Sequence, residues 1–102
     1  MPQKINADTW VYTVITDPGP GEQLLGQHDV DADIAYIPIF LEKEHATQGL
    51  LQLEVARGTR CEIQALLYDD ITRAAGKNGF LVYLLDASGN VLEKIAPAIQ
   101  KH

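Results

Sequence analysis

Stretches with a strand-like pattern of apolar and polar positions alternate along the chain with stretches that have a helix-like pattern. Some stretches are dense in β-branched and aromatic residues or alternate between apolar and polar positions, which favours strands, whereas others repeat apolar residues every three or four positions, which favours helices. Gly58 and Gly79 follow the two helical stretches, as is typical of helix ends. The pattern predicts strands over 10–16, 34–40, 61–68, 80–85 and 91–95, and helices over 42–57 and 69–77.

This order, β-β-α-β-α-β-β, predicts an α/β fold bordering on α+β, as a single domain over 1–102. We expect two layers: a mixed sheet of about five strands, with two helices mainly on one face. Right-handed crossovers place both helices on one face if strands 34–40, 61–68 and 80–85 follow one another across the sheet. A reversal of strand order between the two crossovers would instead put the helices on opposite faces.

The segments outside these elements have a different composition. Residues 17–33 begin with Asp-Pro-Gly-Pro-Gly and continue as a run without a regular period, so we expect a flexible acidic loop there. Residues 1–9 and 97–102 are expected to be terminal tails.

One face of the predicted sheet has no helix to cover it. An apolar surface of this kind typically contacts a partner. Its members would be Tyr36, Leu66, Tyr68, Leu81 and Tyr83, beside the polar Glu62 and Gln64.

Charge and composition exclude several classes of function. The 102 residues include 8 basic and 14 acidic ones, which gives a net charge of −6. Binding to nucleic acids or to anionic membranes needs clustered basic residues, and here they are scattered. Because Cys61 is the only cysteine and residues 1–8 lack the apolar stretch of a secretory signal, we expect a cytoplasmic protein.

Acidic residues follow the strands of the predicted sheet, where ligands gather in open α/β folds. Asp69, Asp70 and Asp86 could hold Mg²⁺ there and, through it, a phosphate. The simpler interpretation, which we favour, is that they are helix-cap and turn residues. A second acidic run, Asp29-x-Asp31-x-Asp33, resembles the start of a calcium loop, but its later positions lack the required Gly and Glu.

No catalytic set is apparent in the sequence. Cys61 opens a strand on its core face, and neither His45 nor His102 has an identifiable partner. Glycine-rich nucleotide motifs are missing, so we expect no cofactor.

From residue 36 onward the chain resembles the SseB-like and similar small bacterial domains. The resemblance rests on a Tyr-Ile-Pro-Ile-Phe strand over 36–40, a Glu-x-Ala-x-x-Gly-Leu helix over 44–50, Glu-Ile-Gln-Ala over 62–65, Asp-Ile over 70–71, and Asn-Gly-Phe-Leu-Val-Tyr-Leu-Leu-Asp leading into Gly-Asn-Val-Leu over 78–92. It implies a small α/β fold with no established enzymatic activity and a role in protein–protein contact.

Together these observations predict a non-catalytic interaction or regulatory module that uses an open sheet face. Its partner would be a second copy of the chain or another protein. The alternative is a domain that binds a small ligand or a divalent cation through Asp69, Asp70 and Asp86, or an enzyme built on such a domain.

Overall fold

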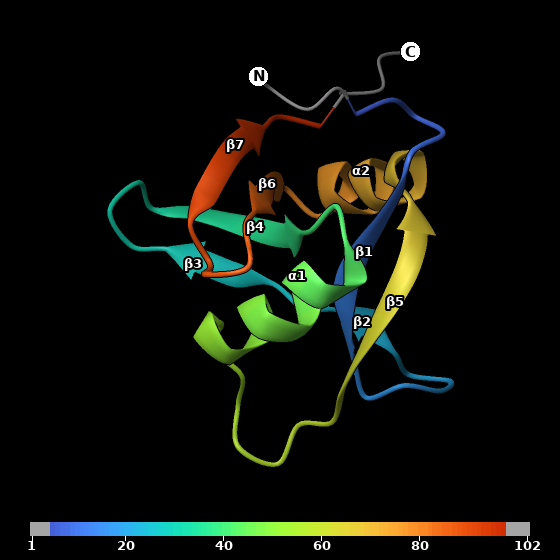
Figure 1. The fold of residues 1–102 in the computed structure, drawn as a ribbon, viewed down its shortest axis with the longest axis vertical. Coiled ribbons are helices and arrows are strands. Elements are labelled where there is room, and N and C mark those ends of the chain that lie inside the picture. The colour runs from blue at the N-terminus through green and yellow to red at the C-terminus, as the bar shows by residue number, and fades with distance from the viewer. Residues whose placement is uncertain (1–4, 98–102) are drawn as a thin grey trace.

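The computed structural model describes residues 5–97, and its elements follow the predicted order with additions in the first half (Figure 1). Residues 1–4 and 98–102 of the predicted tails lie outside the described residues. The strands are β1 (Trp10–Thr16), β2 (Gln23–Leu24), β3 (Gln27–Asp29), β4 (Ile34–Ile39), β5 (Cys61–Leu67), β6 (Leu81–Leu85) and β7 (Val91–Ile95). The helices are α1 (Lys43–Gly49), the short 3₁₀ helix η1 (Leu50–Gln52) and α2 (Tyr68–Lys77).

These strands form two sheets rather than one. In the first, β1 lies between β2 and β5 and is antiparallel to both. The second has the order β3-β4-β6-β7, and only β4 and β6 are parallel. The five predicted strands are all present, but the prediction of a single mixed sheet of about five strands is wrong. Residues 17–33 contain β2 and β3, of two and three residues, which are too short to show a period in the sequence.

The two sheets are joined where β1 meets the end of β4. Tyr12 and Phe40 exchange both backbone hydrogen bonds, each at 2.8 Å. Two residues earlier, Pro38 has no N–H to donate, and its carbonyl accepts a hydrogen bond from the buried Thr13 hydroxyl at 2.8 Å. Since β3 pairs with β4 only as far as Tyr36, Pro38 occupies the place where this edge of β4 changes partner from β3 to β1.

The strand order also decides where the helices lie. Because β1 is antiparallel to both β4 and β5, these two strands run in the same direction with β1 between them. The connection through α1 therefore leads outward from β4 to β5, and the connection through α2 leads back to β6. Right-handed crossovers in opposite directions lie on opposite faces, and Figure 1 shows α1 and α2 on opposite sides of β4. The prediction of both helices on one face is wrong, and the reversed strand order is the one found.

Apolar side chains fill the space on both sides of β6. Successive residues of a strand point to opposite faces, and β6 is apolar at every position, so it contributes to both sides. The α2-side core contains Val11, Ile37, Ile39, Ile71, Ala75, Val82 and Leu84. The α1-side core contains Phe40, Ala46, Tyr83 and Leu85.

The first helix is shorter than its pattern predicts. α1 and η1 together end at Gln52, whereas the apolar spacing predicts a helix to residue 57. Beyond η1, the Gln27 side chain accepts a hydrogen bond from the backbone N–H of Glu54 at 2.8 Å and donates to its carbonyl at 2.7 Å. These contacts satisfy both backbone groups of Glu54 without a helix. Within residues 5–97, no helix has the length and apolar character needed to cross a membrane.

Gly49→Ala should destabilise the protein through the contact between α1 and Phe40. A Cβ atom at Gly49 would clash with Cε2 of the Phe40 ring, which is fully buried. Overpacking a core costs about 1–3 kcal/mol, which exceeds the roughly 1 kcal/mol that Ala gains in helix propensity. Urea denaturation should therefore show a lower free energy of unfolding. The control is Gly76→Ala at an exposed position of α2, which should leave that energy unchanged or slightly higher; equal losses in both variants would contradict the packing argument.

Candidate functional site

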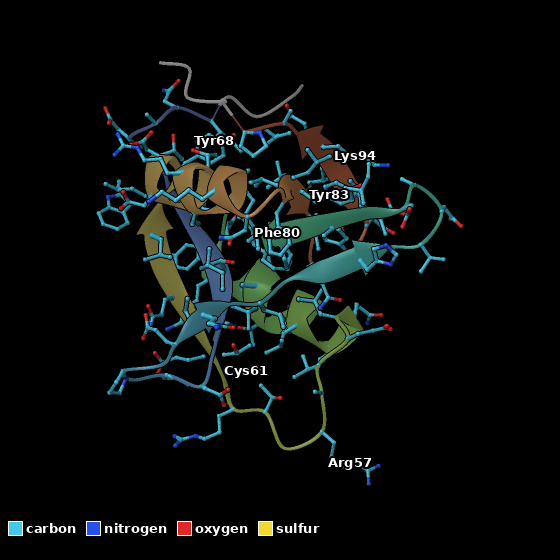
Figure 2. The ribbon with its side chains drawn as sticks, turned by 180° about the vertical axis from the view of Figure 1, so that it is seen from behind. Arg57, Cys61, Tyr68, Phe80, Tyr83 and Lys94 are labelled. Carbon is cyan, nitrogen blue, oxygen red and sulfur yellow. The ribbon has the colours of Figure 1, made fainter. Side chains whose placement is uncertain are left out.

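The residues predicted to line an open sheet face lie on two sides of the structure. Tyr36, Leu81 and Tyr83 belong to or pack against the α1-side core, whereas Leu66 and Tyr68 pack against the α2-side core. Figure 2 shows Tyr68 beside α2 and Tyr83 on β6. Tyr83 is only 1% exposed. Since each face of β4 and β6 is covered by one helix, these five residues do not form one accessible surface.

Tyr83 is instead part of a polar cluster that links four strands. Its hydroxyl donates a hydrogen bond to the Asp29 carboxylate at 2.9 Å, and its ring stacks on that of Tyr36 with centroids 4.0 Å apart. The Lys94 ammonium lies 3.5 Å from the same carboxylate oxygen and 5.3 Å from the centre of the Tyr83 ring. We call these residues, from β3, β4, β6 and β7, the Asp29 cluster.

The charges of this cluster follow from its contacts. The hydrogen bond from Tyr83 is the main cause that lowers the pKa of Asp29, with help from the Ala32 backbone N–H and from Lys94. Burial, followed by the hydrogen bond to Asp29, raises the pKa of Tyr83. Burial also raises the pKa of Tyr36. Asp29 is therefore held anionic and both tyrosines neutral, so none of them is poised to exchange a proton near neutral pH.

The acidic run at 29–33 does not converge on a cation. Asp29 points to Tyr83, whereas Asp33 lies 3.0 Å from the His28 ring nitrogen. Across residues 5–97, no group of three His, Cys, Asp or Glu side chains is arranged to hold a metal ion. This part of the chain forms the β3–β4 turn and anchors it to the sheet.

Asp69 and Asp70 lie in the first turn of α2. The helix begins at Tyr68 with Leu67 as its N-cap residue, so neither Asp occupies the cap itself. Asp69 forms an ion pair with Arg73 at 2.9 Å, one turn along the helix. Both carboxylates are favoured there by the partial positive charge of the helix N-terminus.

Asp86 is separated from these two residues. β1 and β4 lie between β5 and β6, and the backbone of Asp86 approaches Gly49 of α1, on the opposite face from α2. Its carboxylate accepts a hydrogen bond from the backbone N–H of Asn90 at 2.9 Å, which is the main cause that lowers its pKa. Asp86 thus serves the β6–β7 turn, and the structure does not bring it together with Asp69 and Asp70.

The outer edge of β5 is a site that the sequence does not reveal. β5 pairs with β1 over all seven of its residues, and it is the last strand of its sheet. Thr9 and Asp17, just outside β1, hydrogen-bond to Tyr68 and Arg60. In an antiparallel ladder the bonds alternate, so Cys61, Ile63 and Ala65 direct their backbone N–H and C=O groups outward. We call these outward groups the β5 edge.

An apolar stripe accompanies the β5 edge on its α1 side. All four β5 residues on this face are apolar, and Ala65 is exposed while Ile63 and Leu67 are half-buried. Trp10, the register partner of Leu67, is on the same face and is 60% exposed. The members of the apolar stripe are Trp10, Cys61, Ile63, Ala65 and Leu67.

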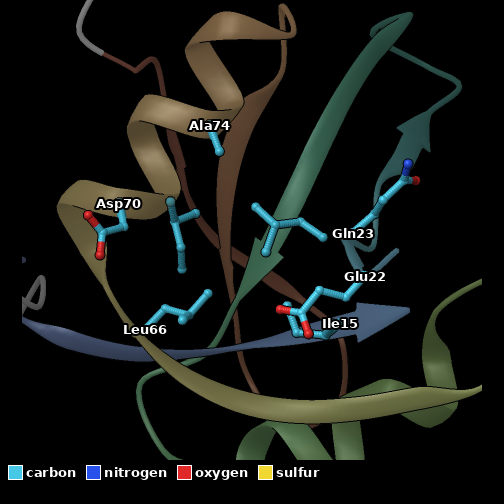
Figure 3. Close-up of a pocket in the computed structure, with 8 residues that line it drawn as sticks. Ile15, Glu22, Gln23, Leu66, Asp70 and Ala74 are labelled. Atoms are coloured by element: carbon cyan, nitrogen blue, oxygen red, sulfur yellow. The ribbon is translucent and has the colours of Figure 1, made fainter. Parts of the chain in front are cut away.

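A cavity of about 210 Å³ lies between α2 and the first sheet (Figure 3). Its lining is mainly apolar and comes from β1, β2, β5 and α2, and Figure 3 shows the carboxylates of Glu22 and Asp70 on either side of it. The lining residues are Ile15, Glu22, Gln23, Leu24, Leu66, Asp70, Ile71 and Ala74.

No known family model, curated protein or solved structure matches this chain. The resemblance to SseB-like domains therefore stays a prediction.

Acid should weaken the protein through the Asp29 cluster. The folded-state pKa of Asp29 is lowered, so its stabilising contribution is complete above the ordinary carboxyl pKa of about 3.9 and is lost as the pH falls through the lower folded value. Asp29→Asn should reduce the free energy of unfolding at neutral pH and make it less sensitive to acid, as measured by urea denaturation between about pH 7 and pH 2.

Tyr83→Phe should reproduce this change, because it removes the donor to Asp29 and keeps the ring that stacks on Tyr36. The control is Asp31→Asn in the same turn, at an exposed position. A wild-type acid response in Asp29→Asn, or an equal change in Asp31→Asn, would contradict the role of the cluster.

Proposed function

We propose that this protein is a non-catalytic protein-interaction module, and that its contact surface is the β5 edge with the adjoining apolar stripe. The observation that carries the proposal is the row of outward backbone groups on β5, beside exposed Trp10 and Ala65. An extended strand of a partner would add to this edge through main-chain hydrogen bonds, and its side chains would cover the apolar stripe.

A comparison of the sheet edges supports this choice. Folded proteins protect edge strands by keeping them short or by placing bulges, lysines or prolines on them. β2 and β3 are two and three residues long, and β7 carries Lys94 and pairs with β6 through an irregular register at Leu84 and Leu85. β5 has seven residues in continuous register, without Pro, Lys or a bulge, and Glu62 is its only charge.

The apolar stripe supplies what an interface needs besides hydrogen bonds. Trp is the residue type most often found to dominate binding energies, because it offers a large rigid surface at a small entropic cost. Trp10 stands beside Leu67 at one end of the edge, and Ala65 leaves room for a larger side chain opposite. A strand added to β5 would thus bury apolar area on one face.

The charge states of the tyrosine and carboxyl groups support a non-catalytic role. Proton transfer is most efficient when a group titrates near the working pH. The shifts here go the other way: the pKa values of Asp29 and Asp86 are lowered, and burial raises those of Tyr36, Tyr68 and Tyr83. These groups are held in their ordinary charge states.

A strand-forming peptide tests the proposal directly. We expect a short peptide of alternating Thr and Val with Lys at each end to shift the amide NMR signals of Cys61, Ile63 and Ala65 and to slow their hydrogen exchange. The inward amides of Glu62 and Gln64 should respond less, because they already pair with β1. Shifts concentrated on β7, or none at saturating peptide, would refute the β5 edge as the contact surface.

Ala65→Pro is the matched variant for this titration. It removes one outward donor and leaves the ladder to β1 intact, so the peptide response should be lost while the fold persists. Leu92→Lys, at a 57% exposed position on the other long edge, should respond like the wild type.

The cavity under α2 favours a second candidate function, the binding of a small amphiphilic cation. We propose that its apolar floor holds the alkyl part and that Glu22 or Asp70 at its rim faces the ammonium group. This candidate site differs from the cation site predicted from the sequence. That site needs Asp69, Asp70 and Asp86 together, and Asp86 lies apart from the other two.

Thermal unfolding with hexylamine tests this second candidate. A ligand that binds the native state raises the melting temperature, so hexylamine should raise it and hexanol should do so less. Asp70→Asn should reduce the difference between the two ligands. Equal effects of the amine and the alcohol on the wild type would exclude recognition of the cation.

A further inference from the structure

The geometry points to a second copy of this chain as the partner at the β5 edge. We infer that two β5 strands pair antiparallel about a two-fold axis at Gln64 and form a continuous sheet with the order β2-β1-β5-β5-β1-β2. This inference rests on the proposed function, because it needs the β5 edge to accept a strand.

The register follows from which backbone groups point outward. In an antiparallel pair, residues with outward groups must face one another to exchange hydrogen bonds. Cys61, Ile63 and Ala65 have outward groups, whereas the carbonyl of Leu67, the N-cap residue of α2, accepts the first hydrogen bond of that helix. Centring the axis on Gln64, the middle residue of β5, pairs all seven positions: Cys61 faces Leu67 of the other copy, and Ile63 faces Ala65.

The side chains of β5 fit this register. A large Ile opposite a small Ala on each side of the axis lets the two apolar stripes interdigitate rather than collide. Glu62, the only charged residue of β5, faces Leu66 of the other copy, so the two carboxylates are kept apart. A parallel arrangement in register would instead place like charges next to each other, which is destabilising. The Gln64 amide nitrogen donates one hydrogen bond to Glu62 at 2.7 Å. At the axis, its second N–H and its carbonyl oxygen can pair with the Gln64 amide of the other copy.

The net charge sets a condition on this dimer. Each copy carries −6, so the two repel at long range. Salt screens that repulsion, whereas main-chain hydrogen bonds and apolar contacts change little. The dimer should therefore gain population as the salt concentration rises, which is the opposite of an interface held by ion pairs.

Sedimentation and cross-linking test the inference together. The weight-average mass should rise from that of one chain towards twice that value with concentration, and Ala65→Pro should keep it at one chain. If Ala65→Pro alters the far-UV circular dichroism, Ala65→Lys, which leaves the backbone intact, replaces it.

Single cysteines then report the register. In a Cys61→Ser background, Gln64→Cys should form a covalent dimer on mild oxidation, because the Cα atoms of two such opposed residues lie about 4.5 Å apart, within disulfide reach. The matched control is Glu62→Cys in the same background. In this register, position 62 of one copy faces position 66 of the other. The two introduced cysteines would therefore lie four residues apart, roughly 13 Å along the strands, and should not cross-link.

Each outcome separates this inference from the proposed function. A chain that stays monomeric at all concentrations and salt levels refutes the second copy, while the peptide titration still decides whether the β5 edge accepts strands. A dimer that Ala65→Pro weakens but that cross-links through Glu62→Cys refutes the Gln64 axis alone. A dimer that Ala65→Pro and Ala65→Lys leave intact refutes pairing through β5.

Discussion

The paired backbone hydrogen bonds between Tyr12 and Phe40 are the contact on which the rest of this structure depends. They insert β1 between β4 and β5, and this insertion separates strands that the chain would otherwise place next to each other. Phe40 also determines how α1 packs on the sheet, because its ring lies in the α1-side core against Gly49, which has no side chain there. Pro38 makes the change of partner possible, since it offers no N–H to extend the β3 ladder and its carbonyl is satisfied by Thr13.

The insertion of β1 also explains why β6, which is apolar at every position, contributes to two separate cores. With the crossovers running in opposite directions, each helix covers one face of β4 and β6, and every position of β6 finds an apolar environment. The polar exception is the Tyr83 hydroxyl, which is buried with its ring but reaches the partly exposed Asp29 at the margin of the sheet. A buried hydroxyl needs such a partner, so the Asp29 cluster ties the β3–β4 turn to the α1-side core.

The sequence predicts the elements with a clear period and misses those that depend on contacts between distant residues. All five predicted strands and α2 are present, because their side chains repeat over enough positions to identify one buried face. The end of α1 depends on Gln27, whose side chain binds the backbone of Glu54 twenty-seven residues away, and no local pattern reports this. The pairing of Asp29 with Tyr83 spans fifty-four residues and has no sequence signal either. For β5, alternation separates an apolar face from a more polar one, but it predicts the apolar face to be the core face. Alternation also does not show that the strand lies at an edge, since that follows from its pairing with β1 alone.

The two long edges of the structure differ in a way that bears on how copies of the chain would assemble. A protein with two unprotected edges can add copies at both ends and form open fibrils. Here β7 has an irregular register and the charges of Glu93 and Lys94, and only β5 is regular and nearly uncharged. Pairing of the two β5 edges about a two-fold axis would consume both of the unprotected edges, so the assembly closes at two copies. The same asymmetry that selects β5 as a contact surface therefore limits the size of the complex.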